Sequence, residues 1–169
     1  SDQHYGKLTK TYTPDNYEKT LDFIGQQLVA NRETYKEFDV DKLIIGYLGD
    51  GPDGTGIYPS QPHHQKITDV GDQCLSLAKH NVSWIRRLRK HIFSGVDIHG
   101  VVGNHPRVSR YANEKTNFDT ITYRYMQMLL DTTDIPVYHD ENNAFIQKVN
   151  VRGHNFLLYH GHDIRNSGG

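Results

Sequence analysis

Apolar positions recur at two spacings along the chain, and each spacing predicts a different kind of element. Over residues 17–31 and again over 67–92, apolar side chains lie three and four positions apart, which predicts two amphipathic helices. The apolar face of the first helix is expected to contain Leu21, Ile24, Leu28 and Val29. A third helix is expected after residue 110, from the spacing of Ile121, Tyr125, Met128 and Leu129. Short apolar runs predict strands at residues 43–48, 96–102, 137–138, 144–149 and 156–159.

The order of these elements predicts how the sheet is built. The run at 43–48 is apolar without interruption, which is typical of a central strand buried on both faces. Together with the second helix and the next strand, it makes a strand–helix–strand unit typical of layered α/β folds. The last two runs flank Gly153 and predict an antiparallel hairpin. We therefore expect a single α/β (α+β) domain over residues 1–169.

Composition excludes several classes of protein. The chain is 36% hydrophobic and 23% charged, with a formal net charge of -1, so it does not coat nucleic acid by bulk charge. No apolar run is long enough to span a bilayer, and no signal-peptide pattern opens the chain. The single cysteine, Cys74, excludes an internal disulfide framework. These features predict a cytoplasmic protein without a membrane partner, of the cell or of a phage-infected host, and leave its oligomeric state open.

Residue types that bind metals follow the predicted strands. Asp50 comes directly after the run at 43–48, where a buried carboxylate needs a cation or hydrogen-bond donors. In open α/β sheets, the carboxyl ends of the strands are where the chemistry is placed. The side chains delivered in this way are Asp2 and His4, then Asp50, then Asn104 and His105, and finally His160 and His162. Taken singly, each motif also fits a frayed terminus or an ordinary turn, and their succession favours a site.

The mixture of carboxylate, imidazole and amide indicates the kind of ion. Such a mixture suits a transition metal better than calcium or an all-thiolate site. More than five candidate ligands exceed the needs of one ion and fit two ions that share a bridging carboxylate. We expect two divalent metal ions, with manganese first and iron, nickel, zinc or magnesium as alternatives.

The ordered motifs resemble one protein family. Asp-x-His, Gly-Asp, Gly-Asn-His and an apolar strand that ends in His-Gly-His are similar, in this order, to the motifs of the calcineurin-like metallophosphoesterase superfamily. Residues 56–61, Gly-Ile-Tyr-Pro-Ser-Gln, further resemble the Tyr-Pro-Gly-Gln loop of the archaeal family-D DNA polymerase small subunit and of related phage phosphoesterases, with Ser60 in place of a glycine. The resemblance implies an αββα sandwich of two mixed β-sheets flanked by helices.

The resemblance also implies a role for each motif residue. It places the first metal on Asp2 and His4, the second on Asn104 and His160, and Asp50 as a bridge between them. It places His105 beside the scissile phosphate as the proton donor. Arg107 is expected as a second catalytic residue on chemical grounds, because its guanidinium, like that of Arg110, can make bidentate contacts to a phosphate. Further contacts to the ligands or the substrate are expected from Asp53, Arg110, His162 and Asp163.

Two departures from the family pattern qualify this assignment. An acidic residue usually follows Gly-Asn-His, where this chain has Pro106 and Arg107. The family's final Gly-His-x-His is also absent, because Ile164 stands where its second histidine belongs. With no strand before Asp2 either, the pattern is that expected of a metallophosphoesterase domain truncated at both ends.

The expected activity is hydrolysis of nucleic-acid phosphodiesters, in DNA or RNA, by a nuclease-like metal-dependent phosphoesterase. The polymerase- and phage-like loop and the two arginines after Gly-Asn-His favour this activity. Two alternatives remain open at this point. One is a phosphomonoesterase that acts on protein or on a small molecule. The other is a non-catalytic subunit of a polymerase that keeps the fold and has lost the chemistry.

Overall fold

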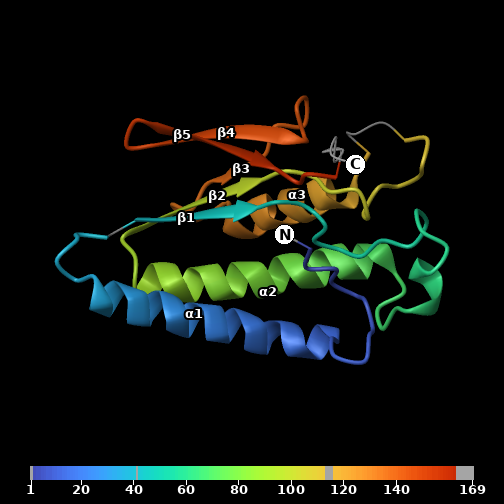
Figure 1. Ribbon diagram of the computed structural model, residues 1–169, viewed down its shortest axis with the longest axis horizontal. Coiled ribbons are helices and arrows are strands. Elements are labelled where there is room, and N and C mark those ends of the chain that lie inside the picture. The colour runs from blue at the N-terminus through green and yellow to red at the C-terminus, as the bar shows by residue number, and fades with distance from the viewer. Residues whose placement is uncertain (1, 41, 113–115, 163–169) are drawn as a thin grey trace, which may run out of the picture.

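The computed structural model describes residues 2–40, 42–112 and 116–162 of the chain (Figure 1). A three-stranded parallel sheet forms the centre, and a two-stranded antiparallel hairpin lies on one of its faces. The helices lie on the opposite face of this sheet, with α1 outermost in the view of Figure 1. The fold is therefore mixed α/β, with helices and both parallel and antiparallel strand pairs. No helix in the described ranges is long and apolar enough to cross a membrane.

The parallel sheet has the order β1-β2-β3. Its strands are β1 (Lys42–Tyr47), β2 (Gly95–Gly100) and β3 (Val137–Tyr138). In the described part of the chain β1 is an edge strand, so the prediction that it is central is wrong. Its apolar run still reflects cover on both faces, because helices lie on one face of β1 and the hairpin lies on the other. A Cβ added at Gly46 would lie 3.5 Å from the methyl groups of Leu158 in the hairpin.

Three long helices carry most of the core. They are α1 (Tyr17–Thr34), α2 (Val70–His91) and α3 (Phe118–Leu130), and short 3-10 turns lie at Pro14–Asn16 and Gln61–His63. The predicted helices are confirmed, and α2 is the one buried most deeply. The side chains of Leu77 and Ile85 on α2 are 0% exposed. Asp69 caps α2 by accepting a hydrogen bond from the backbone N–H of Asp72.

The buried face of α1 differs from the predicted one. Ile24 and Val29 are each 41% exposed, whereas Leu21 and Gly25 are buried. A Cβ at Gly25 would lie 3.1 Å from the indole Nε1 of Trp84 on α2, so the helices approach closely at this glycine. The crossing is therefore set by the residue without a side chain. A prediction from the spacing of apolar side chains does not count Gly25, and it therefore placed the buried face of α1 wrongly.

The face of α3 is also rotated from the predicted one. Met126 is fully buried, whereas Met128 is 72% exposed. The hydroxyl of Tyr123 donates a hydrogen bond of 2.8 Å to the carbonyl of Val101, in the loop that follows β2. A buried hydroxyl needs such a partner, and this bond keeps the Tyr123 side of α3 against the sheet.

The hairpin matches its prediction. Strands β4 (Ile146–Val151) and β5 (His154–Tyr159) pair antiparallel, with Ile146 opposite Tyr159. The turn between them contains Arg152 (φ 49°) and Gly153 (φ 85°), both in the left-handed region. Pairing in this register brings the end of β5 to the carboxyl end of β1.

Cys74 offers a direct test of the helical core. The thiol is 0% exposed on the inner face of α2, and burial raises its pKa to about 11. Because the thiolate is the reactive form, labelling of the native protein by a disulfide reagent at pH 8 is expected to be at least about tenfold slower than labelling in denaturant. Rapid labelling of the native chain would contradict the packing described for α2.

Candidate metal centre

Four segments meet at the carboxyl ends of β1 and β2. The N-terminal segment runs beside the loop after β1, where the amide of Asp2 donates to the carbonyl of Gly49 (3.1 Å) and the amide of His4 donates to that of Asp50 (2.9 Å). The loop after β2 carries Asn104 and His105, and the segment after β5 carries His160. Residues distant in sequence are thereby collected at one edge of the sheet.

The backbone is strained at three of the predicted ligands. Asp2, His4 and Asp50 have φ values of 53°, 43° and 54°, in the left-handed region that non-glycine residues rarely adopt. Only one other described non-glycine residue, Arg152 in the hairpin turn, shares this conformation. Such strain costs on the order of 1–3 kcal/mol per residue and clusters at functional sites.

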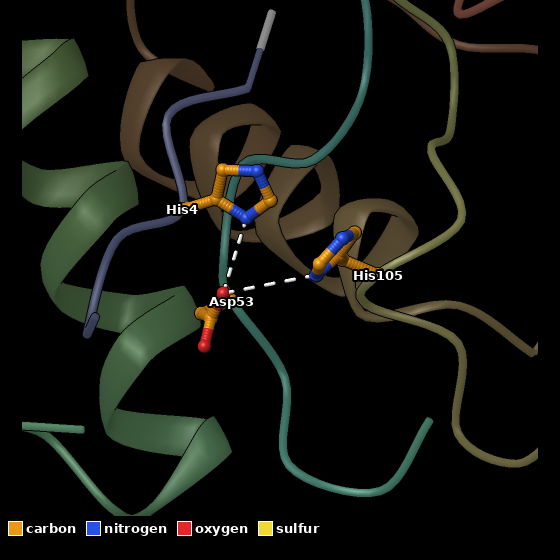
Figure 2. A group of neighbouring side chains, drawn as sticks. All are labelled: His4, Asp53 and His105. Atoms are coloured by element: carbon orange, nitrogen blue, oxygen red, sulfur yellow. Dashed lines mark hydrogen bonds and ion pairs between the residues drawn. The ribbon is translucent and has the colours of Figure 1, made fainter. Parts of the chain in front are cut away.

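One cluster of side chains contains His4, Asp53 and His105 (Figure 2). The Nδ1 atom of His4 lies 3.1 Å from Oδ1 of Asp53, and Nδ1 of His105 lies 3.8 Å from the same oxygen. The two imidazole rings meet edge to face with centroids 4.4 Å apart. Because a carboxylate only accepts hydrogen bonds, Nδ1 of His4 carries the proton in this bond and Nε2 is left to face the second cluster.

The second cluster contains Asp2, Asp50 and His160, with Asn104 beside them. The Nε2 atom of His160 lies 3.3 Å from Oδ2 of Asp50 and 2.8 Å from Oδ1 of Asn104. The Nε2 atom of His4 lies 3.9 Å from Oδ1 of Asp2 and 4.0 Å from Oδ2 of Asp50. Asp50 therefore lies between the imidazoles of His4 and His160. All five predicted metal ligands are brought together.

The hydrogen bonds around His160 test whether this cluster fits a cation. The Nδ1 atom lies 2.7 Å from the carbonyl oxygen of Leu48, which only accepts, so Nδ1 carries a proton. In the neutral ring, Nε2 then presents a lone pair to Asp50 and Asn104. The amide nitrogen of Asn104 donates to the hydroxyl of Tyr58 (2.5 Å), which leaves its oxygen facing His160. Three acceptor atoms converge, an arrangement that a protonated ring or a bound cation satisfies.

The charges of the site lead to the same conclusion. Asp50 and Asp53 are each 1% exposed. Within the described ranges, neither carboxylate forms an ion pair with a lysine or an arginine, and their charged or chargeable partners are histidines. Buried carboxylates are normally paired with a cationic side chain or coordinate a metal. The donor set therefore fits a divalent metal ion.

His105 is attached to both clusters. Its backbone N–H donates to Oδ1 of Asp50 (2.9 Å), and its ring lies 4.4 Å from the ring of Tyr58. Burial lowers the pKa of His105, and the neighbouring Asp50 carboxylate acts in the opposite direction. The ring is thus held at the edge of the site, within reach of Asp53.

The remaining predicted residues lie around this centre. Arg107 donates from Nε to the carbonyl of Asn104 (3.0 Å), and Arg110 donates from Nε to that of Ile57 (2.9 Å), so both bind loop backbone. His162 packs its ring 5.3 Å from the ring of Phe145 and 5.4 Å from that of His160. Asp163 lies outside the described residues.

Gln61 organises the loop that carries Tyr58. Its Oε1 atom accepts from the backbone amides of Ile57 (2.8 Å) and Tyr58 (2.9 Å), and its Nε2 donates to the carbonyl of Asp53 (2.5 Å). In the sequence this loop stands out by its length, by its glycines and prolines, and by its resemblance to Tyr-Pro-Gly-Gln. The hydrogen bonds add a physical role, which is to tie Tyr58 to the segment that bears Asp53.

Sequence reasoning missed Asp119. This residue is 1% exposed, and its carboxylate accepts hydrogen bonds from the backbone amides of Asp50, Gly51 and Gly103. Burial raises the pKa of Asp119 to about 7, while the backbone hydrogen bonds act in the opposite direction. Its only signal in the sequence is an aspartate in the first turn of a helix, and ordinary helices show the same feature.

Gly103 permits the close approach of the two loops. A Cβ at this position would lie 2.0 Å from Oδ1 of Asp50, so Gly103→Ala is expected to destabilise the fold by roughly 1–3 kcal/mol or more, as overpacking does. Urea unfolding measures this loss. Gly56→Ala is the control, because a Cβ there meets no atom closer than 4.0 Å. Equal stability of the two variants would contradict the described approach of the loops.

Comparisons with known proteins give a limited result. No protein-family model matches the chain, and no solved structure matches it. Two curated proteins, each described as "DNA polymerase II small subunit" and coming from two strains of Halobacterium salinarum, are 24% identical to the chain over 177 residues. The chain is thus similar to a DNA polymerase small subunit. The match covers 95% of this chain and 31% of each relative, so the chain spans about a third of their length.

Proposed function

We propose that this chain carries the metal centre of a phosphoesterase that uses two divalent metal ions, manganese first among the candidates, to hydrolyse phosphodiester bonds of nucleic acids. The observation that carries the proposal is the convergence of His160, Asp50 and Asn104 through acceptor atoms alone. The similarity to a DNA polymerase small subunit supports a nucleic acid as the substrate. We also propose that the domain has the αββα sandwich fold of the metallophosphoesterases.

The distances support a division of the ligands between two ions. Two ligand atoms that bind the same ion, each at about 2 Å, lie no more than about 4 Å apart. The Nε2 atom of His4 meets this limit with Asp2 (3.9 Å) and Asp50 (4.0 Å), and that of His160 meets it with Asp50 (3.3 Å) and Asn104 (2.8 Å). Asp50 is therefore assigned as the bridge.

The Nδ1 atoms of His4 and His160, which are not assigned to a metal, form the hydrogen bonds that metal-binding histidines usually form. Nδ1 of His4 donates to the Asp53 carboxylate and Nδ1 of His160 donates to the Leu48 carbonyl. Such bonds fix the ring and direct the other nitrogen at the metal. Asp53 is thus assigned to orienting His4, although its cluster with His4 and His105 could itself hold an ion.

The remaining chemistry is assigned to His105 and Arg107. When bound, two divalent ions would lower the pKa of a bridging water and neutralise phosphoryl charge. His105, at the edge of the site, protonates the departing oxygen. Among the described residues, Arg107 donates from its Nε to the Asn104 carbonyl, and its terminal nitrogens are assigned to a phosphate oxygen.

The test measures metal content and substrate preference together. Protein stripped with EDTA and reloaded with Mn²⁺ is assayed on bis-p-nitrophenyl phosphate, p-nitrophenyl phosphate and labelled DNA. The expected result is two ions per chain, faster hydrolysis of diesters than monoesters, and loss of activity in EDTA. Preference for the monoester would indicate a phosphomonoesterase instead. Failure to bind metal would refute the proposal.

The alternative of a non-catalytic polymerase subunit has its own support. The relatives are described as polymerase subunits and are about three times as long as the matched segment. Under this alternative, metal binds without hydrolysis of any of the three substrates, and the same assay distinguishes the two functions.

A further inference from the structure

Asp119 occupies a place that metal binding does not explain. It lies in the first turn of α3 and is 1% exposed, and its carboxylate faces backbone amides rather than the candidate ligand atoms. Its Oδ2 atom accepts from the amides of Asp50 (3.1 Å) and Gly103 (2.8 Å), and its Oδ1 atom accepts from Gly51 (2.9 Å). One carboxylate therefore joins the loop after β1 to the loop after β2.

These amides belong to the ligands or to their direct neighbours. The amide of Asp50 is that of the proposed bridging ligand itself, and Gly103 immediately precedes Asn104. Asp50 also has a left-handed backbone (φ 54°), as does Gly49 before it (φ 84°). A strained segment keeps its conformation only when neighbouring groups hold it in place. The hydrogen bonds of Asp119 contribute to that constraint, beside those from the amides of Asp2 and His4 to the carbonyls of Gly49 and Asp50.

A second pair of hydrogen bonds ties α3 to the same loop. The side-chain oxygen of Asn117 caps the helix by accepting from the amide of Asp119 (2.8 Å). Its side-chain nitrogen donates to the carbonyl of Gly103 (2.9 Å). The start of α3 thus forms hydrogen bonds with both backbone polar groups of Gly103: Asp119 binds its N–H and Asn117 binds its C=O.

We propose that Asp119 is a positioning residue that fixes Asp50 and Asn104 relative to each other and thereby sets the affinity of the site for its metal ions. This inference rests on the proposed function, because it takes both residues as metal ligands. It assigns to α3 a part in the site that no sequence motif indicates.

Only a carboxylate satisfies all three amides. Both oxygens of Asp119 act as acceptors, and one of them accepts twice. In Asp119→Asn, an NH₂ group replaces one oxygen and faces at least one backbone N–H. The shape of the side chain is kept, and the connection between the two loops is broken on one side.

The test is the affinity for Mn²⁺, measured by equilibrium dialysis at a temperature where each variant is folded. Asp119→Asn is expected to bind Mn²⁺ about 10–100-fold more weakly, as when outer partners of metal ligands are lost. The matched control is Thr122→Val, one turn along the same helix. Thr122 is 2% exposed, and its hydroxyl bonds to the carbonyl of Phe118 in the helix and to the thiol of Cys74 on α2, away from the loop amides that Asp119 binds.

The visible spectrum of the Co²⁺-loaded protein separates positioning from general stability. It is expected to change in Asp119→Asn and to stay unchanged in Thr122→Val. Gly51→Ala provides a second variant, because its Cβ would lie 2.9 Å from Oδ1 of Asp119 and would displace that carboxylate. It is expected to weaken Mn²⁺ binding in the same direction, by a smaller factor.

Two results would overturn the inference while leaving the proposed function intact. The first is wild-type Mn²⁺ affinity and Co²⁺ spectrum in Asp119→Asn. If Asp119→Asn does not fold, the second is a wild-type Mn²⁺ affinity and a wild-type Co²⁺ spectrum in Gly51→Ala. By contrast, a wild-type protein that binds no Mn²⁺ would refute the proposed function itself, and the inference with it.

Discussion

Asp50→Asn is expected to abolish metal binding and hydrolysis together. The Asp50 carboxylate is 1% exposed and lies between the imidazoles of His4 and His160, at 4.0 and 3.3 Å. An amide removes the charge that a bridging ligand provides to both ions and leaves only one oxygen to serve them. Elemental analysis of the dialysed protein and a diesterase assay measure the two losses.

A matched control separates charge at the site from charge in the sheet. Asp97 lies on the neighbouring strand β2 and forms an ion pair with Lys42 (2.6 Å) at the end of β1 away from the site. Asp97→Asn is expected to retain both metals. If Asp50→Asn also shows full two-metal loading, Asp50 is not the bridge.

His105→Ala is expected to separate metal binding from proton transfer. The ring lies at the edge of the site beside Tyr58, with its Nδ1 atom 3.8 Å from Asp53. As a positioned acid it would contribute about 10²–10⁴-fold to hydrolysis of substrates with poor leaving groups. The variant is expected to keep its metals and lose this factor on DNA, and to lose much less on an activated aryl diester, whose leaving group needs little protonation.

The comparison of substrates decides between three roles for His105. His63→Ala is the control, because His63 is exposed in the loop before α2. Loss of metal from His105→Ala would make the residue a ligand, in the cluster with His4 and Asp53. Equal rate losses on both substrates, together with a lower melting temperature, would mean that the ring only packs the loop.

Sequence patterns predicted the elements well because each is long enough to average over local exceptions. The three helices, the unit formed by β1, α2 and β2, and the hairpin all follow from apolar periodicity. Apolar periodicity does not predict the contacts between helices. Gly25 sets the crossing of α1 by having no side chain, and the Tyr123 hydroxyl sets the face of α3. Both effects depend on a partner distant in sequence.

The candidate site was predictable for a related reason. Strand ends mark the edge of a sheet, so the motifs around Asp50, Asn104 and His160 could be placed together from the chain alone. Asp119 could not, because its partners are backbone amides, which every residue offers. A contact from Asp53 to the ligands was expected, but its partner was not, because His4 lies 49 positions away in the sequence.

The two ends of the described chain meet at one cluster, where Asp2 and His160 flank Asp50. An ion bound to both residues would close a long loop of the polypeptide, and closing such a loop costs the unfolded chain more entropy than closing a short one. The binding energy of the ion would then oppose complete unfolding more than local opening. At a metal concentration about 100 times the dissociation constant, this amounts to about 2.7 kcal/mol. The metal would thus cross-link the segments that carry Asp2 and His160, and its release would loosen both of them together.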